Sequence, residues 1–402
     1  MIWTFALATA LQLLAWRLVF ARAFASPPAL PKGEGAATAY GSLPPPLPTW
    51  EGVNYHAVAA PSPPGRAGGE VSVIVCFHNE ASTLEHCLRS ILAQDYPAFE
   101  VVAVDDNSTD DSAALVTELQ TRHTNLRLVR PGPTRPGKKD ALTAGVAAAR
   151  HECLLLTDAD CAPASPQWLS QMTAPLAAEN EVVLGCSPYT YRPGPLNFWQ
   201  RYEATYTALQ YLGFARLGAP YMGVGRNLAY RKSFFLRAGG LARHAHLPGG
   251  DDDLLVNHHA PANATTRVVH PAAWTYSAPS LHWGDYLRRK LRHQSVGPLY
   301  RRRHQLLLTT LALSHGLFYL LGFLLLFTPY RYVALYGYVV RMAVVWEALN
   351  AAHTRQFLAG GPAASGSVPP ANDRLWLPVA DLLQAPFYVF LLLGSLWGRR
   401  GW

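Results

Sequence analysis

Charged side chains are scarce in this chain of 402 residues. Asp, Glu, Lys and Arg make up 15% of it, against about 25% in an average soluble protein. Cysteine is rare too: there are five, with no Cys-x-x-Cys pair, which excludes a disulfide scaffold and a zinc ribbon. Hydrophobic residues reach 50%, which excludes an intrinsically disordered protein. Part of the chain is therefore expected to face something other than water.

Two common phosphate-binding motifs are also missing. A P-loop needs the pattern G-x-x-x-x-G-K-[S/T], and the dinucleotide fingerprint needs G-x-G-x-x-G directly after the first strand. Neither pattern occurs there. The segment Gly137-Lys138-Lys139 does open a predicted helix, where backbone N–H groups and lysines can meet phosphate oxygens. Lys138 is therefore a candidate for binding the phosphates of a substrate, without the specificity of a P-loop.

The formal net charge of +8 would by itself suit a nucleic-acid-binding protein. The positive charge is clustered, however: seven Lys and Arg residues lie from Arg288 to Arg303, directly before a long apolar run. Such a cluster is typical of protein next to anionic lipid headgroups. We therefore expect membrane lipids as partners and no nucleic acid.

Apolar runs near the C-terminus predict membrane-spanning helices, because crossing about 30 Å of hydrocarbon takes roughly 20 mostly apolar residues. The strongest run, residues 306–327, holds no Asp, Glu, Lys or Arg. Residues 332–351 include Arg341, and residues 375–397 include Asp381. Each of these two runs is compatible with a spanning helix, a re-entrant pair or an interfacial helix. We therefore expect two or three C-terminal spans.

The N-terminal apolar run, residues 2–16, has two interpretations. The sequence Ala23-Phe24-Ala25 resembles a signal-peptidase site, which would make the run a cleaved secretion signal. No positive charge precedes the run, whereas Arg17 and Arg22 follow it. The positive-inside rule then favours an uncleaved anchor with the following domain in the cytoplasm.

These features divide the chain into five predicted regions. A tether is expected after the anchor because its sequence is rich in Pro, Gly and Ala, without a core of its own. The regions are an N-terminal membrane anchor (1–22), the tether (23–70), a catalytic domain (71–280), a basic interfacial helix (281–304) and a C-terminal transmembrane region (305–402).

The middle of the chain has the pattern of an α/β domain. Short apolar runs alternate with stretches whose apolar residues recur at helical spacing, which predicts βαβ units and a mostly parallel sheet. The predicted strands are 71–77, 99–104, 126–129, 153–157 and 182–185, and the predicted helices are 81–94, 112–122, 139–150 and 166–178. In such sheets ligands bind beyond the carboxyl ends of the strands.

Polar residues cluster at those strand ends. Asn79 and Glu80 follow the first predicted strand, and Asp105 and Asp106 follow the second. The next residues, Ser108-Thr109-Asp110, are more typical of a helix cap than of a catalytic site. Two adjacent carboxylates, by contrast, repel each other unless a cation or a donor-rich ligand is present. Asp105 and Asp106 are therefore candidate ligand-binding residues.

Asp158 and Asp160 follow the fourth predicted strand and form a D-x-D pattern. Residues two apart in an extended chain point to the same side, so both carboxylates can address one ligand. Hard cations such as Mg²⁺ and Mn²⁺ bind carboxylate oxygens together with substrate phosphates. The pattern is common in proteins, but at a strand end it predicts a site for Mg²⁺ or Mn²⁺ with a diphosphate.

These elements, in this order, resemble the family 2 glycosyltransferases, in particular membrane-anchored bacterial ones, whose catalytic domain has the GT-A fold. The resemblance covers roughly residues 70–303. Its motifs are Val71-Ser-Val-Ile-Val-Cys-Phe-His-Asn-Glu80, Val101-Val-Ala-Val-Asp-Asp-Asn-Ser108, Gly137-Lys-Lys-Asp-Ala-Leu142, Leu155-Leu-Thr-Asp-Ala-Asp160 and Gly249-Gly-Asp-Asp-Asp-Leu254.

The resemblance implies roles for individual residues. A nucleotide-sugar would be bound by Asn79, Glu80, Asp105, Asp106, Lys138 and Asp158, and a metal by Asp160 with Asp158. Family members often have Glu-Asp-x-Asp-Leu at the acceptor motif, where this chain has Gly250 in place of Glu. Asp251 is then the first choice for the general base and Asp252 the second. Without the other motifs, a solvated helix N-terminus would explain these carboxylates equally well.

Basic residues are expected on the acceptor and diphosphate side. Membrane-bound family members carry Gln-x-x-Arg-Trp before a transmembrane helix, where this chain reads Arg289-Lys-Leu-Arg292-His293. The lost Gln and Trp favour transfer of a single sugar over polymer synthesis. Trp283 and its apolar neighbours suit a helix in the membrane interface. The residues expected on this side are Arg226, Asp253, Arg289, Arg292 and His293.

The resemblance implies an inverting, metal-dependent hexosyltransferase. Its donor would be a UDP- or GDP-sugar, its acceptor a lipid-linked or cell-envelope glycan, and its place the cytoplasmic face of the inner membrane. A nucleotidylyltransferase is an alternative, but a glycine-rich basic segment would then follow the first strand. A non-catalytic membrane scaffold with the same fold is the other alternative.

Overall fold

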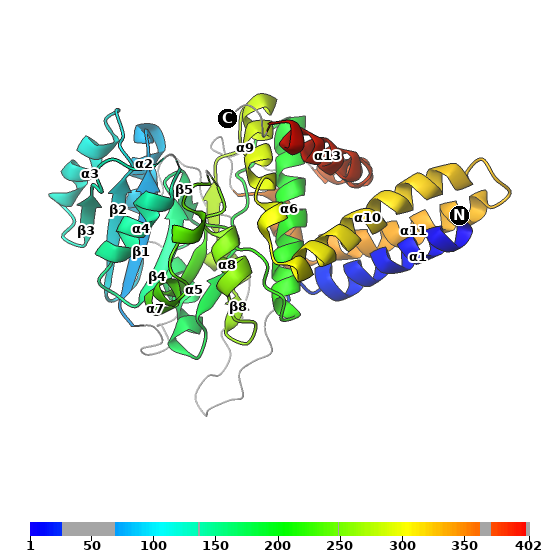
Figure 1. The fold of residues 1–402 in the computed structure, drawn as a ribbon. Coiled ribbons are helices and arrows are strands. Elements are labelled where there is room, and N and C mark those ends of the chain that lie inside the picture. The colour runs from blue at the N-terminus through cyan, green and yellow to red at the C-terminus, as the bar shows by residue number, and fades with distance from the viewer. Residues whose placement is uncertain (26–68, 136, 248, 362–370, 399–402) are drawn as a thin grey trace.

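The computed structural model describes residues 1–25, 69–135, 137–247, 249–361 and 371–398. Most of the predicted tether lies outside these residues. The described chain forms an α/β domain and a group of long helices that extend from one side of it (Figure 1).

The domain is built on a seven-stranded sheet with the order β3-β2-β1-β4-β7-β6-β8. Its strands are parallel except β7, which runs antiparallel to β4 and β6. The five predicted strands are confirmed, whereas β7, β8 and a two-stranded sheet of β5 and β9 were not predicted. The strands are β1 (Val71–Phe77), β2 (Phe99–Asp105), β3 (Leu126–Val129), β4 (Cys153–Asp158), β5 (Cys161–Pro163), β6 (Val182–Leu184), β7 (Leu228–Arg231), β8 (Thr265–Arg267) and β9 (Thr275–Ser277).

Helices cover both faces of the sheet, so β1 is buried along all seven positions. Val73 and Val75 face the core formed with α2, α3 and α5, whereas Ile74 faces the core formed with α4 and α6. A strand buried on both faces has a continuous apolar sequence, which is why these strands could be predicted. The helices are α2 (Ala81–Leu92), α3 (Ser112–Gln120), α4 (Lys139–Ala148), α5 (Trp168–Ala177), α6 (Pro195–Arg216), α7 (Lys232–Arg237) and α8 (Asp253–His259).

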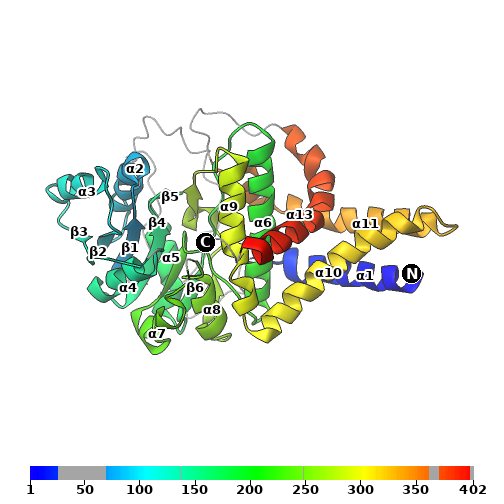
Figure 2. The same cartoon turned by 45° about the horizontal axis from the view of Figure 1, so that its top comes forward.

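Two further helices connect the domain to the long helices. In both cartoon views α6 and α9 (Trp283–Gln294) stand side by side between the sheet and the long helices (Figures 1 and 2). The buried ion pair of Glu203 and Lys290 joins them. The predicted interfacial helix thus forms, but Tyr286 is fully buried and stacks on Phe387, with ring centroids 6.1 Å apart. Its apolar side packs on protein at this position.

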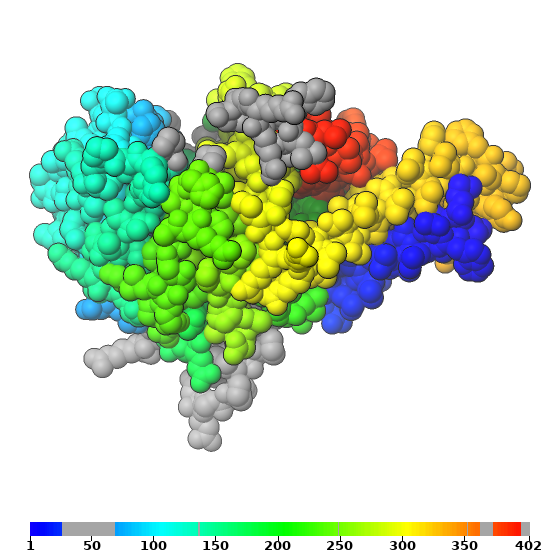
Figure 3. Space-filling model, in the orientation of Figure 1, coloured from blue at the N-terminus to red at the C-terminus, as the bar shows by residue number. Residues whose placement is uncertain are grey.

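Within the described residues, four helices are long and apolar enough to cross a membrane: Ile2–Phe20, Arg302–Leu325, Arg331–Asn350 and Asp373–Gly394. They correspond to α1 (Ile2–Leu14) with its continuation η1 (Ala15–Phe20), α10 (Arg302–Leu325), α11 (Arg331–Asn350) and α13 (Leu377–Gly398). Helices α1, α10 and α11 pack against one another and project from the domain as a narrow arm (Figure 3). All four apolar runs of the sequence therefore form helices.

Two of the apolar runs contain a buried charged residue, and these two residues face each other inside the group of long helices. Arg341 and Asp381 form an ion pair, and both side chains are fully buried. Asp381 also accepts a hydrogen bond from Tyr319, and Arg341 donates one to Gln12 over 3.2 Å. Because the charges compensate each other, they are compatible with helices that cross a membrane.

The N-terminal segment packs into the domain. Arg267 donates hydrogen bonds to the carbonyl oxygens of Ala23, over 2.9 Å, and Ala25, over 2.5 Å. The Phe24 ring lies 5.6 Å from the ring of Phe357. The sequence that resembles a signal-peptidase site is therefore part of the folded structure, and the anchor interpretation stays a prediction.

Candidate active site

A cavity of about 560 Å³ lies beyond the carboxyl ends of β1, β2 and β4. Loops after these strands form one side of it, and α6, the start of α8 and the end of α9 form the other. All but two of the candidate residues from the sequence line it: Glu80, Asp106, Lys138, Asp158, Asp160, Arg226, Asp251, Asp252, Asp253, Arg289, Arg292 and His293. The fold thus gathers residues that are up to 213 positions apart, from Glu80 to His293.

Asn79 and Asp105 do not line this cavity. The side-chain oxygen of Asn79 accepts hydrogen bonds from the N–H groups of Thr109, over 2.7 Å, and Asp110. Asp105 accepts one from the N–H of Ser108 over 2.8 Å. Asn79 therefore links the loops after β1 and β2, and Asp105 fixes the loop after β2. Their expected contact with a nucleotide-sugar stays a prediction.

The D-x-D pair occupies the end of β4. Lys138 forms an ion pair with Asp158, and although burial acts to raise the pKa of Asp158, Lys138 lowers it. Burial and the neighbouring Asp158 raise the pKa of Asp160, whose carboxylate accepts a hydrogen bond from Ser277 over 3.4 Å. Lys138 is thus engaged by a carboxylate, and Asp160 lies where another cation would be favoured.

Two arginines face this acidic pair with unused hydrogen-bonding capacity. Among the described residues, one terminal nitrogen of Arg226 and the Nε of Arg289 are buried without a hydrogen-bond partner. The guanidinium carbons of both lie over the ring of Tyr189, at 4.8 and 5.3 Å from its centroid. Buried donors without partners indicate a missing acceptor such as a phosphate group.

The three carboxylates of the acceptor motif have different surroundings. Asp252 caps α8, since it accepts hydrogen bonds from the N–H groups of Asp253, over 3.0 Å, and Gly225. Asp253 accepts one from the hydroxyl of Tyr300 over 3.2 Å. Asp251 makes no hydrogen bond to any residue that the structure describes, so its oxygens are available to a ligand.

Burial and like charges raise the pKa values of this motif. Burial, followed by the charge of Asp251, raises the pKa of Asp252 to about 7. Burial and Asp252 likewise raise the pKa of Asp253 well above its ordinary value. A proton shared among adjacent carboxylates is consistent with a site that accepts a proton during a reaction.

Lys139 is a functional candidate that the sequence analysis missed. Its ammonium group donates hydrogen bonds to the carbonyl oxygens of Leu247, over 2.7 Å, and Gly249, over 2.6 Å. The side chain is almost fully buried, and burial lowers its pKa. It therefore fixes the loop before the acidic motif, a contact between positions 108 apart or more that local sequence cannot reveal.

His293 lies at the end of α9 and lines the cavity. Desolvation, followed by the charges of Lys290 and Arg292, lowers the pKa of His293 well below its ordinary value. The imidazole is therefore neutral at pH 7. The positive charge on this side of the cavity comes from Arg289, Lys290 and Arg292.

No group of three or more His, Cys, Asp or Glu side chains within the described residues is arranged to hold a metal ion. Asp158 and Asp160 supply oxygen ligands of the kind that Mg²⁺ and Mn²⁺ prefer. The donor set fits a divalent cation that takes its other ligands from substrate phosphates and water.

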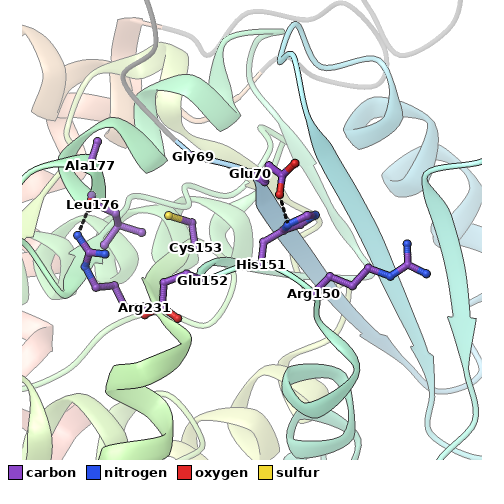
Figure 4. Close-up of a pocket in the computed structure, with 9 residues that line it drawn as sticks. All are labelled: Gly69, Glu70, Arg150, His151, Glu152, Cys153, Leu176, Ala177 and Arg231. Carbon is purple, nitrogen blue, oxygen red and sulfur yellow. Dashed lines mark hydrogen bonds and ion pairs between the residues drawn. The ribbon is translucent and has the colours of Figure 1, made fainter.

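A second cavity, of about 360 Å³, lies at the amino ends of β1 and β4, opposite the acidic residues (Figure 4). Its polar side chains already have partners within the protein. Glu70 pairs with His151 at 3.1 Å, and Arg231 donates a hydrogen bond to the carbonyl oxygen of Leu176 over 2.5 Å (Figure 4). It holds no arrangement comparable to that of the larger cavity.

Comparison with known proteins agrees with this geometry. The family model "Glycosyl transferase family 2" matches residues 72–237, which contain the D-x-D pair and Arg226. Residues 72–237 of the chain are a family 2 glycosyltransferase domain. The mostly parallel sheet with acidic residues at its carboxyl edge confirms the predicted GT-A fold, flanked by helices suited to a membrane.

Individual relatives of this glycosyltransferase match only part of it. Glycosyltransferase AglE of Haloferax volcanii is 29% identical over 127 residues, which are 31% of this chain and 41% of AglE. A poly-beta-1,6-N-acetyl-D-glucosamine synthase of Staphylococcus epidermidis is 31% identical over 90 residues, which are 22% of this chain and 21% of the synthase. The chain thus spans less than half the length of these curated relatives.

Solved structures are similar over more of the glycosyltransferase, at lower identity. The mannosyltransferase PcManGT from Pyrobaculum calidifontis, in complex with GDP-Man and Mn²⁺, has a TM-score of 0.45 and 21% identity, and the match covers 81% of this chain and 87% of that one. S. aureus TarS 1-349 in complex with UDP-GlcNAc has a TM-score of 0.41 and 16% identity, with coverage of 72% and 90%.

Proposed function

We propose that this glycosyltransferase transfers a single sugar, with inversion, from a UDP- or GDP-sugar to a hydroxyl group of a lipid-linked or cell-envelope glycan. The observation that carries the proposal is the placement of three features in one cavity. Among the described residues, Asp160 forms no ion pair, one nitrogen each of Arg226 and Arg289 is buried without an acceptor, and Asp251 accepts no hydrogen bond. These features correspond to a metal, a diphosphate and an acceptor hydroxyl.

The donor end of the cavity would hold the leaving group. Asp158 and Asp160 would hold Mg²⁺ or Mn²⁺ together with the donor phosphates, and the bound cation would neutralise charge on the diphosphate. Arg226 and Arg289 would donate hydrogen bonds to the same phosphate oxygens. Glu80 and Asp106, beyond β1 and β2, would contact the nucleoside.

The acceptor end would supply the base. Asp251 would take the proton of the acceptor hydroxyl as its oxygen attacks the anomeric carbon, and the bond from that carbon to the diphosphate would break on the opposite face. Asp252 suits this role less, because two backbone N–H groups already occupy its oxygens. Arg292 and His293, which line the cavity, would lie on the acceptor side.

The membrane helices support an acceptor at the membrane. Helices α6 and α9, which line the cavity, stand between the sheet and the long helices (Figure 1), so an acceptor held by lipid would reach the base over a short path. Arg17 and Arg22 follow the N-terminal run, which places the domain in the cytoplasm by the positive-inside rule. We therefore assign the enzyme to the cytoplasmic face of the inner membrane.

Nucleotide release tests the proposal. Detergent-purified protein is given UDP-, GDP- and dTDP-sugars with Mn²⁺, Mg²⁺ or a chelator, alongside Asp251→Asn and, as a matched control, Asp95→Asn, an exposed carboxylate outside the cavity. We expect metal-dependent release from one donor, lowered about 10²- to 10⁴-fold in Asp251→Asn and unchanged in the control.

The other outcomes are equally informative. Full activity in a folded Asp251→Asn protein would exclude Asp251 as the base. Metal-dependent nucleotide binding without release would direct the search to lipid-linked acceptors, added back in vesicles. Absence of nucleotide binding altogether would favour a scaffold that retains the fold.

A further inference from the structure

We propose that residues 357–361, which connect the membrane helices α11 and α13 to the domain, position Tyr189 and, through it, the two arginines of the donor cavity. This inference rests on the proposed function for its effect on donor binding. It makes Tyr189 and Gly361 positioning residues of the transferase, and it makes the C-terminal region part of the site as well as an anchor.

Backbone pairing holds the Tyr189 segment from both sides. The N–H of Gly361 donates to the carbonyl oxygen of Tyr189 over 3.1 Å, and the N–H of Tyr191 donates to that of Gly361 over 3.2 Å. On the other side, the N–H of Thr190 donates to the carbonyl oxygen of Ser277 over 3.0 Å. The segment thus forms single β-bridges on both sides, from Tyr189 to Ser277 of β9 and from Thr190 to Gly361, which lies just beyond α12 (Ala352–Ala359).

The approach of the two chains requires glycine. A Cβ atom on Gly361 would lie 2.3 Å from Cδ1 of Tyr276, which no relaxed structure accommodates. Gly360 has a φ of +83°, and a Cβ there would lie 2.6 Å from the carbonyl oxygen of Tyr189. Any side chain at these positions would push residues 360–361 away from the Tyr189 segment.

A buried arginine holds the end of α12 in place. Arg201 of α6 donates hydrogen bonds to the carbonyl oxygens of Leu358, over 2.6 Å, and Ala359, over 3.3 Å. It also forms an ion pair with Asp373, in the segment before α13. A cation at a helix C-terminus is stabilising because it satisfies the last carbonyl groups. The end of α12 is therefore held against α6 and linked to the segment before α13.

Tyr189 connects this fixed segment to the donor cavity. Its ring lies under the guanidinium groups of both Arg226 and Arg289, and Ser277, which pairs with the same segment, donates a hydrogen bond to Asp160. An aromatic face attracts cations, so it holds two like charges at the positions where a diphosphate would need them. Phe357 lines the same cavity.

Four variants test this coupling: Gly361→Ala, Tyr189→Leu, Tyr189→Phe and Gly361→Ala combined with Tyr189→Leu. Gly284→Ala is the matched control, because a Cβ there would meet no atom within 4 Å. Two measurements are made on the full chain in detergent: hydrogen exchange of residues 188–192 without ligand, and the Kd of UDP and of GDP with Mn²⁺ by calorimetry.

We expect Gly361→Ala to speed exchange of residues 188–192, and both Gly361→Ala and Tyr189→Leu to weaken nucleotide binding about 3- to 30-fold. Tyr189→Phe keeps the aromatic face and should bind as the wild type does. Because Gly361 acts through Tyr189, the double variant should bind no more weakly than Tyr189→Leu alone.

Several results would overturn the inference. If hydrogen exchange of residues 188–192 is unchanged in Gly361→Ala, Gly361 does not hold the Tyr189 segment in place. If Tyr189→Leu binds nucleotide with wild-type affinity, the Tyr189 ring does not position the two arginines. Multiplying effects in the double variant would show that the two residues act independently. If Gly361→Ala fails to fold, the nucleotide affinities of Tyr189→Leu and Tyr189→Phe are compared instead, and equal affinities would overturn the inference. If the wild type binds neither nucleotide, the proposed donors are wrong. The hydrogen-exchange data then show by themselves whether Gly361 holds the Tyr189 segment in place.

Discussion

In the α/β domain apolar strands are buried and charged side chains face a water-accessible cavity, whereas in the membrane helices apolar side chains are exposed and charged ones are buried. In the domain, β1 is buried at every position and charged residues gather beyond its carboxyl end, in a cavity open to water. In the long helices, Leu306 and Phe327 are 68% and 77% exposed, whereas Arg341 and Asp381 are fully buried.

The difference follows from the surroundings of each region. Water solvates charges at the surface of the domain, so its core can be purely apolar. Hydrocarbon cannot solvate them, so a charge in a membrane helix must find its partner inside the protein. In the membrane helices the buried Arg341 is therefore paired with Asp381, whereas Arg226 of the domain lines the cavity with one nitrogen that has no partner among the described residues.

The largest effect on stability is expected where the buried membrane charge loses its partner. Arg341→Met would leave Asp381 uncompensated and cost about 3–5 kcal/mol of stability, most of which Arg341→Met with Asp381→Leu should regain. Thermal unfolding in detergent micelles measures both. If the double variant is no more stable than Arg341→Met, the Arg341–Asp381 pair stabilises the protein by more than the compensation of its two charges.

A smaller effect is expected from crowding the domain core. A Cβ on Gly145 of α4 would lie 2.8 Å from Cγ2 of Ile74 and 2.9 Å from Cγ2 of Val104, so Gly145→Ala should cost about 1–3 kcal/mol. Gly316→Ala in α10 is the matched control, because no atom lies within 4 Å of a Cβ there. Equal unfolding temperatures for the two variants would contradict the tight packing of the sheet against α4.

The pH dependence of stability tests the acidic motif. Burial and Asp251 raise the pKa of Asp252 to about 7, whereas this carboxyl ionises at about pH 4 in an unfolded chain. The folded state thus keeps the proton longer, and the stability contributed by Asp252 is full below about pH 4 and is lost as pH rises to about 7. The pKa of about 7 already includes the opposing effects of Lys138 and of the N–H of Gly225.

Thermal unfolding between pH 4 and pH 8, in the presence of a chelator, measures this slope. Asp252→Asn should decline less across the window than the wild type, and Asp95→Asn, which changes an exposed carboxyl, should follow the wild type. A wild-type slope in Asp252→Asn would place the titration on another group.

The smallest effect is expected at an ion pair between two membrane helices that remains exposed. Arg17 and Glu347 lie 3.1 Å apart, with 57% and 59% of their side chains exposed. Arg17→Gln should therefore change stability by less than about 1 kcal/mol. A loss as large as that of Arg341→Met, in the same unfolding assay, would show that exposure in the isolated protein does not describe the pair in its membrane.

Much of the fold followed from local patterns. Continuous apolar runs predicted β1, β2, β4 and β6 because those strands are buried on both faces. Strands β7 (Leu-Ala-Tyr-Arg) and β8 (Thr-Thr-Arg) were missed, since neither is a continuous apolar run and each depends on pairing with distant neighbours. Arg341 and Asp381 could not be matched from sequence because their pairing depends on how α11 and α13 pack.

The amino-acid sequence by itself determined the α/β class, the membrane-suited helices and the carboxylates that line the cavity, because periodicity and strand-end position are local properties. The tertiary structure alone decided that Asp251 keeps free oxygens while Asp252 caps α8, and that Lys138 faces Asp158. It also brought Gly361 to Tyr189, 172 positions away. Such contacts depend on how separate elements pack, which no local pattern encodes.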